Sequence, residues 1–256
     1  MRDVVRARTD SGDDALCGCQ GRAMNFAERA HLSEWMDESC SYEDFRDCLR
    51  DLAQVNRFTL AYRPTLRWLR SVLRPGSAPV HIVDVGCGGG DMLRRVARWA
   101  NREGVAVRLT GIDLNPYAAR AARELVEASC KIEWITGDAF SYEAPVAIDL
   151  IISSLFTHHL PDEEIVRFIA WMERSARTGW FINDLHRERI PYFGFKALAA
   201  VMRWHRFVRH DGPISIRRAF QLHDWNRYLT LAGVPLSEVK LATFRPARLC
   251  VAREKA

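Results

Sequence analysis

Residues 81–93 read HIVDVGCGGGDML, an apolar run that is followed by four glycines and then by a helical pattern. A glycine-rich turn between a strand and a helix usually holds a nucleotide-like ligand, because such a ligand can approach its backbone closely. A dinucleotide site needs a glycine at the sixth position, yet the sixth residue from Gly86 is Asp91. A phosphate loop needs a Lys followed by Ser or Thr, and none follows here. The turn therefore disfavours both kinds of phosphate ligand.

Short apolar runs alternate with helical patterns on both sides of this turn. The expected strands are residues 80–86, 107–114, 132–138, 148–155, 179–185, 237–244 and 247–254. The expected helices of this region are residues 91–101, 116–128, 161–176 and 223–233. Such alternation is typical of an α/β protein with a doubly wound, mainly parallel sheet that helices cover on both faces. The last two runs follow each other like a hairpin, so we expect a seven-stranded sheet with a reversed last strand.

The chain divides into a tail, an arm and an α/β domain. Residues 1–23 mix charges with Gly, Ser and Asp without a sustained period, which predicts a flexible tail. Residues 24–79 predict an N-terminal helical arm, in which Pro64 breaks or restarts a helix. Residues 80–256 predict the α/β domain, with a lid-like helical insert at about residues 186–220.

The charge and the cysteines narrow the class of protein. The formal charge is +5, but only four of the 37 basic residues are Lys, so we attribute part of the excess to an Arg-rich composition rather than to nucleic-acid binding. The seven cysteines are scattered, and only Cys17 and Cys19 lie close together, which disfavours a zinc site. Because no apolar run has the length of a membrane helix or the form of a signal peptide, we expect a cytoplasmic protein with reduced thiols.

Three aspartates at the ends of consecutive strands point to one ligand. Asp84 would repel a pyrophosphate but can accept hydrogen bonds from an ammonium group. Asp113 can accept a pair of hydrogen bonds from a ribose diol, and Asp138 can lie near an adenine amino group, with Ala139 and Phe140 beside the ring. Amine, ribose and adenine together describe S-adenosylmethionine, with S-adenosylhomocysteine as product. Each aspartate could instead be a turn former or a helix cap.

Four motifs carry a resemblance to a known family. VDVGCGGG, GIDLN, TGDAF and DLIISSLFTHHL resemble the ordered cofactor motifs of the class I S-adenosylmethionine-dependent methyltransferases, over about residues 80–185. The resemblance implies a Rossmann-like methyltransferase fold for residues 80–256. The residues expected to bind the cofactor are Asp84, Gly86, Cys87, Gly88, Gly90, Asp113, Leu114, Asp138, Ala139, Phe140 and Ser154.

The catalytic residues are expected at the ends of the fourth and fifth strands. Methyl transfer from a sulfonium is an in-line displacement, and a base helps where the acceptor is a hydroxyl or an acidic carbon. We expect His158, Asp184 and His186 to be catalytic, with Asp184 and His186 forming a base and its orienting partner, and we expect no metal. The alternative is structural: in the resembled family a His pair here is often structural, Asp184 could cap its segment, and His186 could be a solvated loop residue.

The insert predicts the acceptor side of the site. Residues 186–218 carry eight Lys or Arg against two acids, interleaved with apolar residues near helical spacing. This pattern indicates either a helix with a solvated basic face or a lid over a large apolar or aromatic acceptor, with transient contact to a membrane surface. The residues expected to bind the acceptor are Tyr62, Arg63, His159, Tyr192 and Phe193.

A narrower resemblance concerns the acceptor. RHDGP, INDLHR and LAYRPTLRWL look like small-molecule methyltransferases of quinone and polyketide biosynthesis, which implies methylation of an O or C atom of an aromatic, phenolic, quinol or polyketide-derived molecule. The (N/D/S)PP(Y/F) tetrapeptide of nucleic-acid amino-methylases is absent, so no DNA partner is expected. An RNA or protein methyltransferase and a non-catalytic cofactor-binding subunit stay as alternatives, and the sequence does not predict the oligomeric state.

Overall fold

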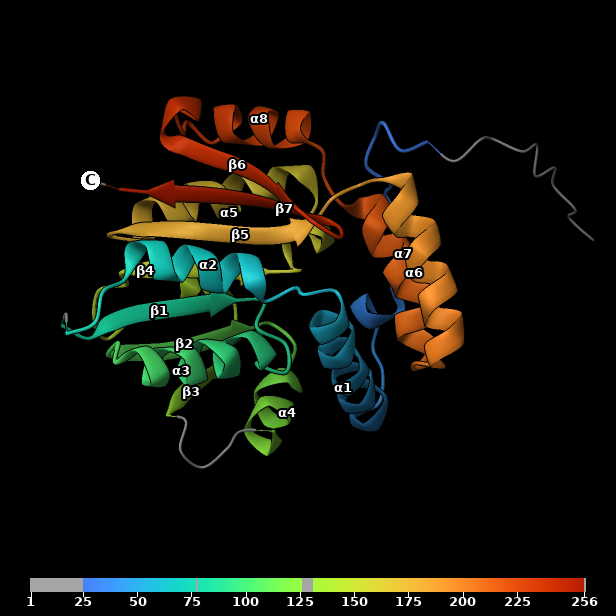
Figure 1. Cartoon of the computed structure of the whole chain (residues 1–256), viewed down its shortest axis with the longest axis horizontal. Helices are drawn as coiled ribbons and strands as arrows, with labels where there is room; N and C mark the ends of the chain where they lie inside the picture. The colour runs from blue at the N-terminus through green and yellow to red at the C-terminus, as the bar shows by residue number, and fades with distance from the viewer. Residues whose placement is uncertain (1–24, 77, 126–130, 256) are drawn as a thin grey trace, which may run out of the picture.

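The strands form one sheet in the computed structural model, which describes residues 25–76, 78–125 and 131–255. In sheet order they are β3 (Ile132–Thr136), β2 (Val107–Asp113), β1 (Val80–Val85), β4 (Leu150–Ser154), β5 (Gly179–Leu185), β7 (Arg248–Glu254) and β6 (Val239–Phe244) (Figure 1). The first five are parallel, and β7 runs antiparallel between β5 and β6. The predicted seven-stranded sheet with a reversed last strand is confirmed.

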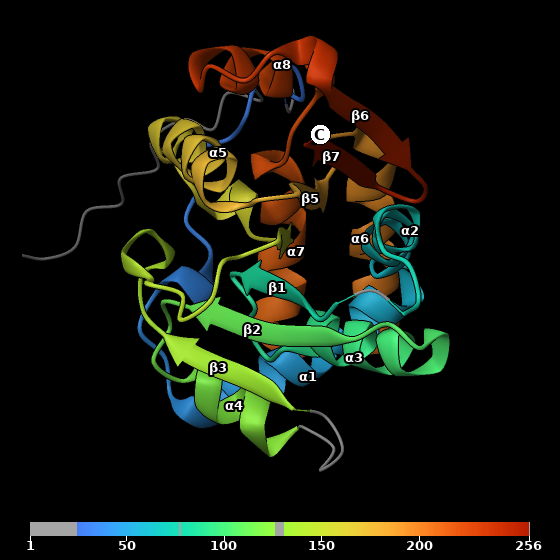
Figure 2. The same cartoon turned by 90° about the vertical axis from the view of Figure 1, so that its left-hand side faces the viewer.

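Helices cover both faces of this sheet (Figure 2). The helices α2 (Arg63–Val72), α3 (Asp91–Glu103) and α4 (Ala118–Glu124) share one core, and α5 (Asp162–Ser175) and α8 (Leu222–Leu231) share the other. Successive strand residues alternate between the cores, since Leu150 and Ile152 face the first and Ile151 faces the second. Burial of each such side chain contributes about 1.5–3 kcal/mol to folding. Because helices cover both faces of the sheet, every position along a central strand is buried and favours an apolar residue.

The order of the strands predicts where a ligand binds. The chain moves outward from β1 through β2 to β3 and then returns to β4 on the other side of β1. The loops that follow β1 and β4 therefore diverge, and in open α/β sheets ligands bind in the crevice at this point, beyond the carboxyl ends of the strands.

The N-terminal arm begins with a segment of little regular structure. This strap, residues 25–37, ends in the short helix η1 (Trp35–Asp37) and leads to α1 (Tyr42–Phe58). The side chain of Ser41 accepts a hydrogen bond from the backbone of Asp44 and so caps α1. Pro64 lies in the first turn of α2, which confirms that it restarts a helix. The predicted tail, residues 1–23, lies outside the described residues.

The insert after β5 consists of two helices, α6 (Arg189–Met202) and α7 (Arg206–Arg218). They pack against each other at Gly212, where a Cβ atom would lie 2.1 Å from the ring of Phe195. Figure 1 shows both helices at the end of the sheet to which β1 and β5 point, next to η1 and α1. The outer face of α6 exposes Ile190 and Val201, and its contact with a membrane surface stays a prediction. Within the described residues, no helix combines the length and the apolarity needed to cross a bilayer.

Three further short helices complete the fold. They are η2 (Ala139–Ser141), η3 (Thr157–His159) and η4 (Leu236–Glu238). The first two follow β3 and β4 directly, so both lie at the edge of the sheet where the ligand crevice is expected.

Candidate functional site

The glycine turn requires glycine at particular positions. Gly86 and Gly90 adopt φ angles of 71° and 73°, which L side chains rarely adopt. A Cβ atom would lie 2.4 Å from the ring of Phe156 at Gly86 and 2.1 Å from the ring of Trp134 at Gly90. Gly90 also precedes α3 directly, so the turn delivers the chain to a helix N-terminus. The predicted strand, glycine turn and helix are therefore present.

Asp84 is a buried carboxylate that lacks a partner. It is 2% exposed, and its Oδ1 atom has no hydrogen-bond partner among the described residues. Burial raises the pKa of Asp84 well above its ordinary value, and the nearby carboxylates of Asp91 and Asp113 raise it further. A buried, unpaired carboxylate beside a ligand turn suits a cationic ligand group, because a cation would supply both the charge and the hydrogen bonds that the site lacks.

Asp113 faces the glycine turn from the end of β2. Its Oδ2 atom accepts a hydrogen bond from the backbone of Gly88 at 2.7 Å, and its Oδ1 atom accepts one from the backbone of Asn115 at 2.9 Å. Burial raises the pKa of Asp113, while these two hydrogen bonds and the charge of His159 oppose that rise. The carboxylate is thus held against the glycine turn, and its contact with a ribose diol stays a prediction. The next residue, Leu114, is 75% exposed.

The remaining predicted cofactor residues lie after β3, in the turn and after β4. Asp138 accepts a hydrogen bond from the backbone of Phe140 at 2.9 Å and so caps η2, which is the structural alternative for this aspartate. Ala139 is buried beneath the cap. Cys87 is buried, and burial raises the pKa of its thiol. The hydroxyl of Ser154 lies 3.5 Å from the hydroxyl of Thr65 in α2. Cofactor contacts at these positions stay predictions.

The arm closes on the glycine turn. The hydroxyl of Tyr62 donates to Asp91 at 2.7 Å, and the amide of Asn56 donates to the same carboxylate oxygen at 3.0 Å. Burial and the adjacent Asp91 raise the pKa of Tyr62. Tyr62 is therefore bound to the start of α3, and Arg63 beside it is exposed. Whether either residue contacts the acceptor stays a prediction.

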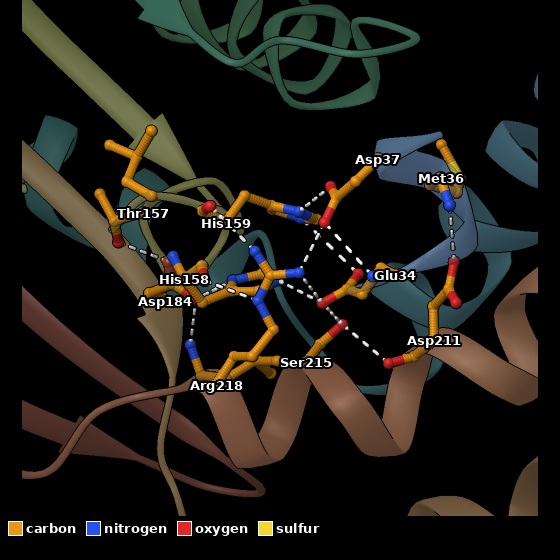
Figure 3. A network of polar contacts seen from close by, with 12 residues as sticks. Glu34, Met36, Asp37, Thr157, His158, His159, Asp184, Asp211, Ser215 and Arg218 are labelled. Carbon is orange, nitrogen blue, oxygen red and sulfur yellow. Dashed lines mark hydrogen bonds and ion pairs between the residues drawn. The ribbon is translucent and has the colours of Figure 1, made fainter. Parts of the chain in front are cut away.

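A second set of polar side chains gathers where the strap, η3, β5 and α7 meet (Figure 3). This polar cluster consists of Glu34, Asp37, His158, His159, Asp184 and Arg218. Leu155 turns the chain from β4 toward η3 with a φ angle of 58°. That conformation costs a residue with a side chain about 1–2 kcal/mol, and such strain is concentrated at functional sites.

His158 pairs with Asp184 at the centre of the cluster. The distance from Nδ1 of His158 to Oδ1 of Asp184 is 2.7 Å, and the side chains are 3% and 0% exposed. Asp184 also accepts hydrogen bonds from the Thr157 hydroxyl at 2.5 Å and from the backbone of Leu185 at 2.7 Å. Burial favours the neutral acid, but the charge and hydrogen bond of His158 outweigh it and lower the pKa of Asp184. Because a carboxylate only accepts hydrogen bonds, the ring donates from Nδ1, which leaves Nε2 on the side away from Asp184.

The predicted pairing of Asp184 with His186 is wrong. Nδ1 of His186 lies 2.9 Å from Glu188 instead. The oxygens of Asp184 are already occupied by Thr157, His158 and Leu185, and His186 lies beyond the end of β5. The partner of Asp184 comes from the neighbouring strand end, since β4 leads into η3 beside β5.

His159 is held by the strap. Its Nδ1 atom lies 2.8 Å from Oδ1 of Asp37, and its side chain is 29% exposed. Nη1 of Arg218 donates to Oδ2 of the same aspartate at 2.6 Å. Burial would raise the pKa of Asp37, but its hydrogen bonds and ion pairs with His159 and Arg218 lower it. The imidazole is thereby fixed with Nε2 turned away from Asp37.

Glu34 completes the cluster and had no signal in the sequence. It is 3% exposed, accepts a hydrogen bond from the Ser215 hydroxyl at 3.0 Å and lies 3.5 Å from Nη1 of Arg218. Burial raises the pKa of Glu34 to about 7, against the opposing charges of His159 and Arg218. The strap residues Glu34 and Asp37 fall in a stretch without a period or a motif, so no sequence pattern could connect them with residues 158 and 159.

Two arginines fasten the strap to the rest of the cluster. Arg218 donates to the carbonyls of His158 at 3.1 Å and His159 at 2.9 Å. Arg29 in the strap donates to the carbonyl of His158 at 3.2 Å and to Asp162 at 2.7 Å. The cluster thus depends on segments from four separate parts of the chain.

The predicted acceptor residues of the insert, Tyr192 and Phe193, are neighbours in α6 whose rings meet edge to face, 5.1 Å apart. Tyr192 is buried, with its ring 5.5 Å from the ring of Phe26 in the strap. Phe193 is 54% exposed on the outer side of α6. Tyr192 therefore fastens the insert to the strap, and an acceptor contact by either residue stays a prediction.

Comparison with known proteins was made for the sequence and for the fold. Residues 82–179 match the family model described as a methyltransferase domain. The chain is 27% identical over 167 residues to a ubiquinone biosynthesis O-methyltransferase of Albidiferax ferrireducens, an alignment that covers 63% of this chain and 60% of that enzyme. It is 27% identical over 227 residues to the enzyme of the same name from Cupriavidus pinatubonensis, which covers 86% of this chain and 80% of that enzyme.

The fold has relatives among solved structures as well. The crystal structure of human N-acetylserotonin methyltransferase in complex with S-adenosylmethionine superposes with a TM-score of 0.59 at 14% identity, over 84% of this chain and 57% of that protein. The matched region runs from β1 to the start of β5 and contains the glycine turn, Asp113 and η3. Residues 82–179 are therefore similar to a methyltransferase domain, and the chain has the Rossmann-like fold of the class I S-adenosylmethionine-dependent methyltransferases that its sequence resembles.

Proposed function

We propose that this protein transfers a methyl group from S-adenosylmethionine to an oxygen atom, or to an acidic carbon, of an aromatic, phenolic, quinol or polyketide-derived small molecule. The observation that carries the proposal is the buried pair of His158 and Asp184, which lies at the carboxyl ends of β4 and β5 beside the cofactor crevice. An oriented imidazole at this place is what a hydroxyl acceptor requires, because its proton must leave as the new bond forms.

The residues around the glycine turn fit S-adenosylmethionine. Asp84 offers its unpaired carboxylate to the ammonium group, and Asp113 offers its carboxylate to the ribose diol. The turn leaves no space for a Cβ atom at Gly86. When bound, the cofactor supplies an activated methyl group on a sulfonium. The similar human fold is crystallised with this cofactor, which supports the same ligand here.

His158 acts as the base in this proposal. Asp184 holds the proton on Nδ1, so Nε2 can take the proton of an acceptor hydroxyl while the oxygen attacks the methyl carbon. The ionised Asp184 then stabilises the positive charge that appears on the ring. General base catalysis of this kind contributes about 10²–10⁴-fold in rate.

The class of acceptor rests on the relatives and on the insert. Both sequence relatives are named ubiquinone biosynthesis O-methyltransferases, and their acceptor class is a proposal for this chain. The insert places apolar and aromatic side chains, among them Tyr192 and Phe195, next to the polar cluster. An acceptor with a hydroxylated ring and an apolar remainder would place its hydroxyl at the polar cluster and its apolar part against the insert.

Calorimetry and a turnover assay test the proposal. We expect the full chain to bind S-adenosylmethionine and S-adenosylhomocysteine, and Asp84→Ala and Asp113→Ala to lose that binding. Incubation with a panel of phenols and quinols should give a product that is heavier by one methyl group. Absence of cofactor binding would refute the proposal outright. Cofactor binding with turnover of RNA or a peptide, but of no small molecule, would refute the acceptor class.

A further inference from the structure

The polar cluster brings three metal-binding side chains together. One ligand atom from each of Glu34, His158 and His159 lies within 4.8 Å of the other two. Oε1 of Glu34 is 4.0 Å from Nε2 of His158, and Oε2 is 3.9 Å from Nε2 of His159. We propose that these three side chains bind one divalent transition-metal ion at the acceptor side of the site.

Both imidazoles are oriented as metal ligands. Nδ1 of His158 is engaged by Asp184, and Nδ1 of His159 is engaged by Asp37. Each ring therefore donates from Nδ1 and turns Nε2 toward Glu34. Ligating histidines in proteins characteristically donate their other N–H to a carboxylate in this way. Two rings that do so toward a single point are a specific arrangement, unlike a lone histidine in a core.

The electrostatics of the cluster call for a cation. The distances from Glu34 to the two Nε2 atoms exceed the range of a hydrogen bond, so within the described part of the chain no hydrogen bond joins Glu34 to either imidazole. The cluster holds three carboxylates and one guanidinium, and the carboxylates of Glu34 and Asp184 are buried. The three carboxylates, when ionised, carry two more negative charges than this guanidinium balances. A divalent ion between Glu34 and the two Nε2 atoms would supply that positive charge.

The ligand set indicates the kind of ion. Two imidazole nitrogens and one carboxylate oxygen suit zinc, cobalt, iron or manganese better than calcium, which prefers oxygen ligands. Metal–nitrogen bonds of about 2.0–2.1 Å place tetrahedral ligand atoms about 3.4 Å apart, so Glu34 would close on the histidines by about 0.5 Å. Glu34 belongs to the strap and can make this shift without moving the sheet. Three protein ligands leave a coordination position open, as in catalytic metal sites.

The open position deepens the proposed function, on which this step rests. An acceptor hydroxyl on the ion would have a lowered pKa and would give its proton to water. Its oxygen would then form a bond to the methyl carbon as the bond from that carbon to sulfur broke, and the thioether would leave neutral. With the ion bound, Nε2 of His158 would be a metal ligand and could not act as the base. The ion would take over its role by lowering the pKa of the acceptor hydroxyl.

Direct metal binding tests the site without reference to activity. The full chain is dialysed against a chelator and titrated with Co²⁺ or Zn²⁺ alone, and Co²⁺ reports its coordination through its visible absorption. We expect one ion per chain, with affinity lowered at least about 100-fold in Glu34→Gln and in His159→Gln, and about 10–100-fold in Asp37→Asn. The matched control is His223→Gln, because His223 is an exposed histidine 3.3 Å from a carboxylate outside the cluster. Circular dichroism checks that each variant is folded.

Two outcomes would overturn the metal site, and neither depends on the proposed function. One is the absence of stoichiometric binding to the wild-type chain, and the other is binding that survives in folded Glu34→Gln and His159→Gln. Methyl transfer by chelator-treated protein at an unchanged rate would refute the role of the ion while leaving the proposed function intact. Stoichiometric metal binding without cofactor binding or turnover would leave the site and refute the function.

Discussion

Asp184 is the buried carboxylate that orients His158 in the polar cluster. It is fully buried, yet its pKa is lowered because its two oxygens accept hydrogen bonds from His158, Thr157 and Leu185. Hydrogen bonds to a charged group are worth about 1.5–3 kcal/mol each, so several of them can offset the cost of burying one carboxylate. Its ionised state in turn decides which nitrogen of His158 carries the proton.

Asp184→Asn should impair both stability and turnover. The asparagine amide would turn a donor toward groups that are themselves donors, at a cost of about 2–4 kcal/mol in the free energy of unfolding. The ring of His158 would lose its fixed tautomer, and kcat should fall about 10²–10⁴-fold. Urea denaturation and steady-state kinetics measure the two effects.

Asp149→Asn is the matched control for this variant. Asp149 accepts a hydrogen bond from the backbone of His81 at the opposite end of the sheet. It should lower stability and leave kcat within a few-fold of wild type. A kcat that falls equally in both variants would show that Asp184 contributes stability alone.

Asp84→Asn should separate binding from stability. In the ligand-free protein the carboxylate is buried without a partner for Oδ1, so a neutral amide should leave the free energy of unfolding unchanged or raise it by up to about 1 kcal/mol. Removal of the charge that meets the ammonium group should weaken S-adenosylhomocysteine binding about 10–100-fold. Thermal denaturation and calorimetry report the two quantities. A clear loss of stability with unchanged affinity would contradict this account of Asp84.

At the scale of elements, turns and helix ends position the two halves of the site. The glycine turn joins β1 to α3, and Leu155 joins β4 to η3. Both connections carry positive φ angles at the carboxyl ends of neighbouring strands. Phe156 fills the space beside Gly86, so the cofactor turn and the segment that bears His158 are packed against each other.

Gly86→Ala should reveal that packing. The new methyl group meets the Phe156 ring at 2.4 Å in addition to the strain of a φ angle of 71°, and we expect a loss of about 2–4 kcal/mol in unfolding free energy. Gly104→Ala is the control, since its φ angle is 68° and nothing lies within 4 Å of the added Cβ atom. That variant should lose only about 1–2 kcal/mol. Equal losses in chemical denaturation would mean that the contact with Phe156 is unimportant.

The start of α5 should give stability a defined pH dependence. Burial raises the pKa of Asp162, but the hydrogen bond from Tyr228 and the charges of Arg29 and Arg227 lower it below the ordinary value of 3.8. A lowered pKa contributes stability above the unfolded pKa and loses it as pH falls through the folded pKa. Asp162→Asn should therefore cost about 1 kcal/mol at pH 7, a modest value because the group is partly exposed, and progressively less below pH 3.8. Urea titrations over this range test the trend, and a difference that is constant with pH would contradict it.

At the scale of the whole molecule, the strap joins the arm to the insert across the site. Arg29 reaches η3 and α5, Phe26 packs on Tyr192 of α6, and the backbone of Trp35 donates to Asp211 of α7. His158 is 3% exposed beneath these contacts, so an acceptor can reach it only when the strap or the insert moves. We therefore expect the strap or the insert to open in the catalytic cycle proposed above.

Arg29→Met should loosen the strap. It removes hydrogen bonds to three backbone carbonyls and to Asp162, which should lower the unfolding free energy by about 2–3 kcal/mol and speed amide exchange at Ala30 and Trp35. Arg227→Met removes an exposed partner of the same carboxylate and should cost less than about 1 kcal/mol. Hydrogen-exchange mass spectrometry measures the change, and unaltered exchange in residues 26–37 would show that Arg29 does not hold the strap.

Periodicity and local motifs were enough to predict the seven-stranded sheet with its reversed last strand and the positions of the glycine turn and the aspartates at strand ends. All of these are signals between residues close in sequence, and cofactor binding by these aspartates stays a prediction. Asp84 and Asp113 accordingly lie where their motifs predicted.

The acceptor side depended on contacts between distant residues. Asp184 turned out to meet His158, 26 positions away, rather than His186. Glu34 reached the histidines from more than a hundred positions upstream, through a strap with no motif or period. Short-range patterns encode strands, turns and caps because neighbouring residues share one backbone geometry. The pairing of charges in a buried cluster is decided by which segments the folded core brings within hydrogen-bond distance, and that is a property of the tertiary structure alone.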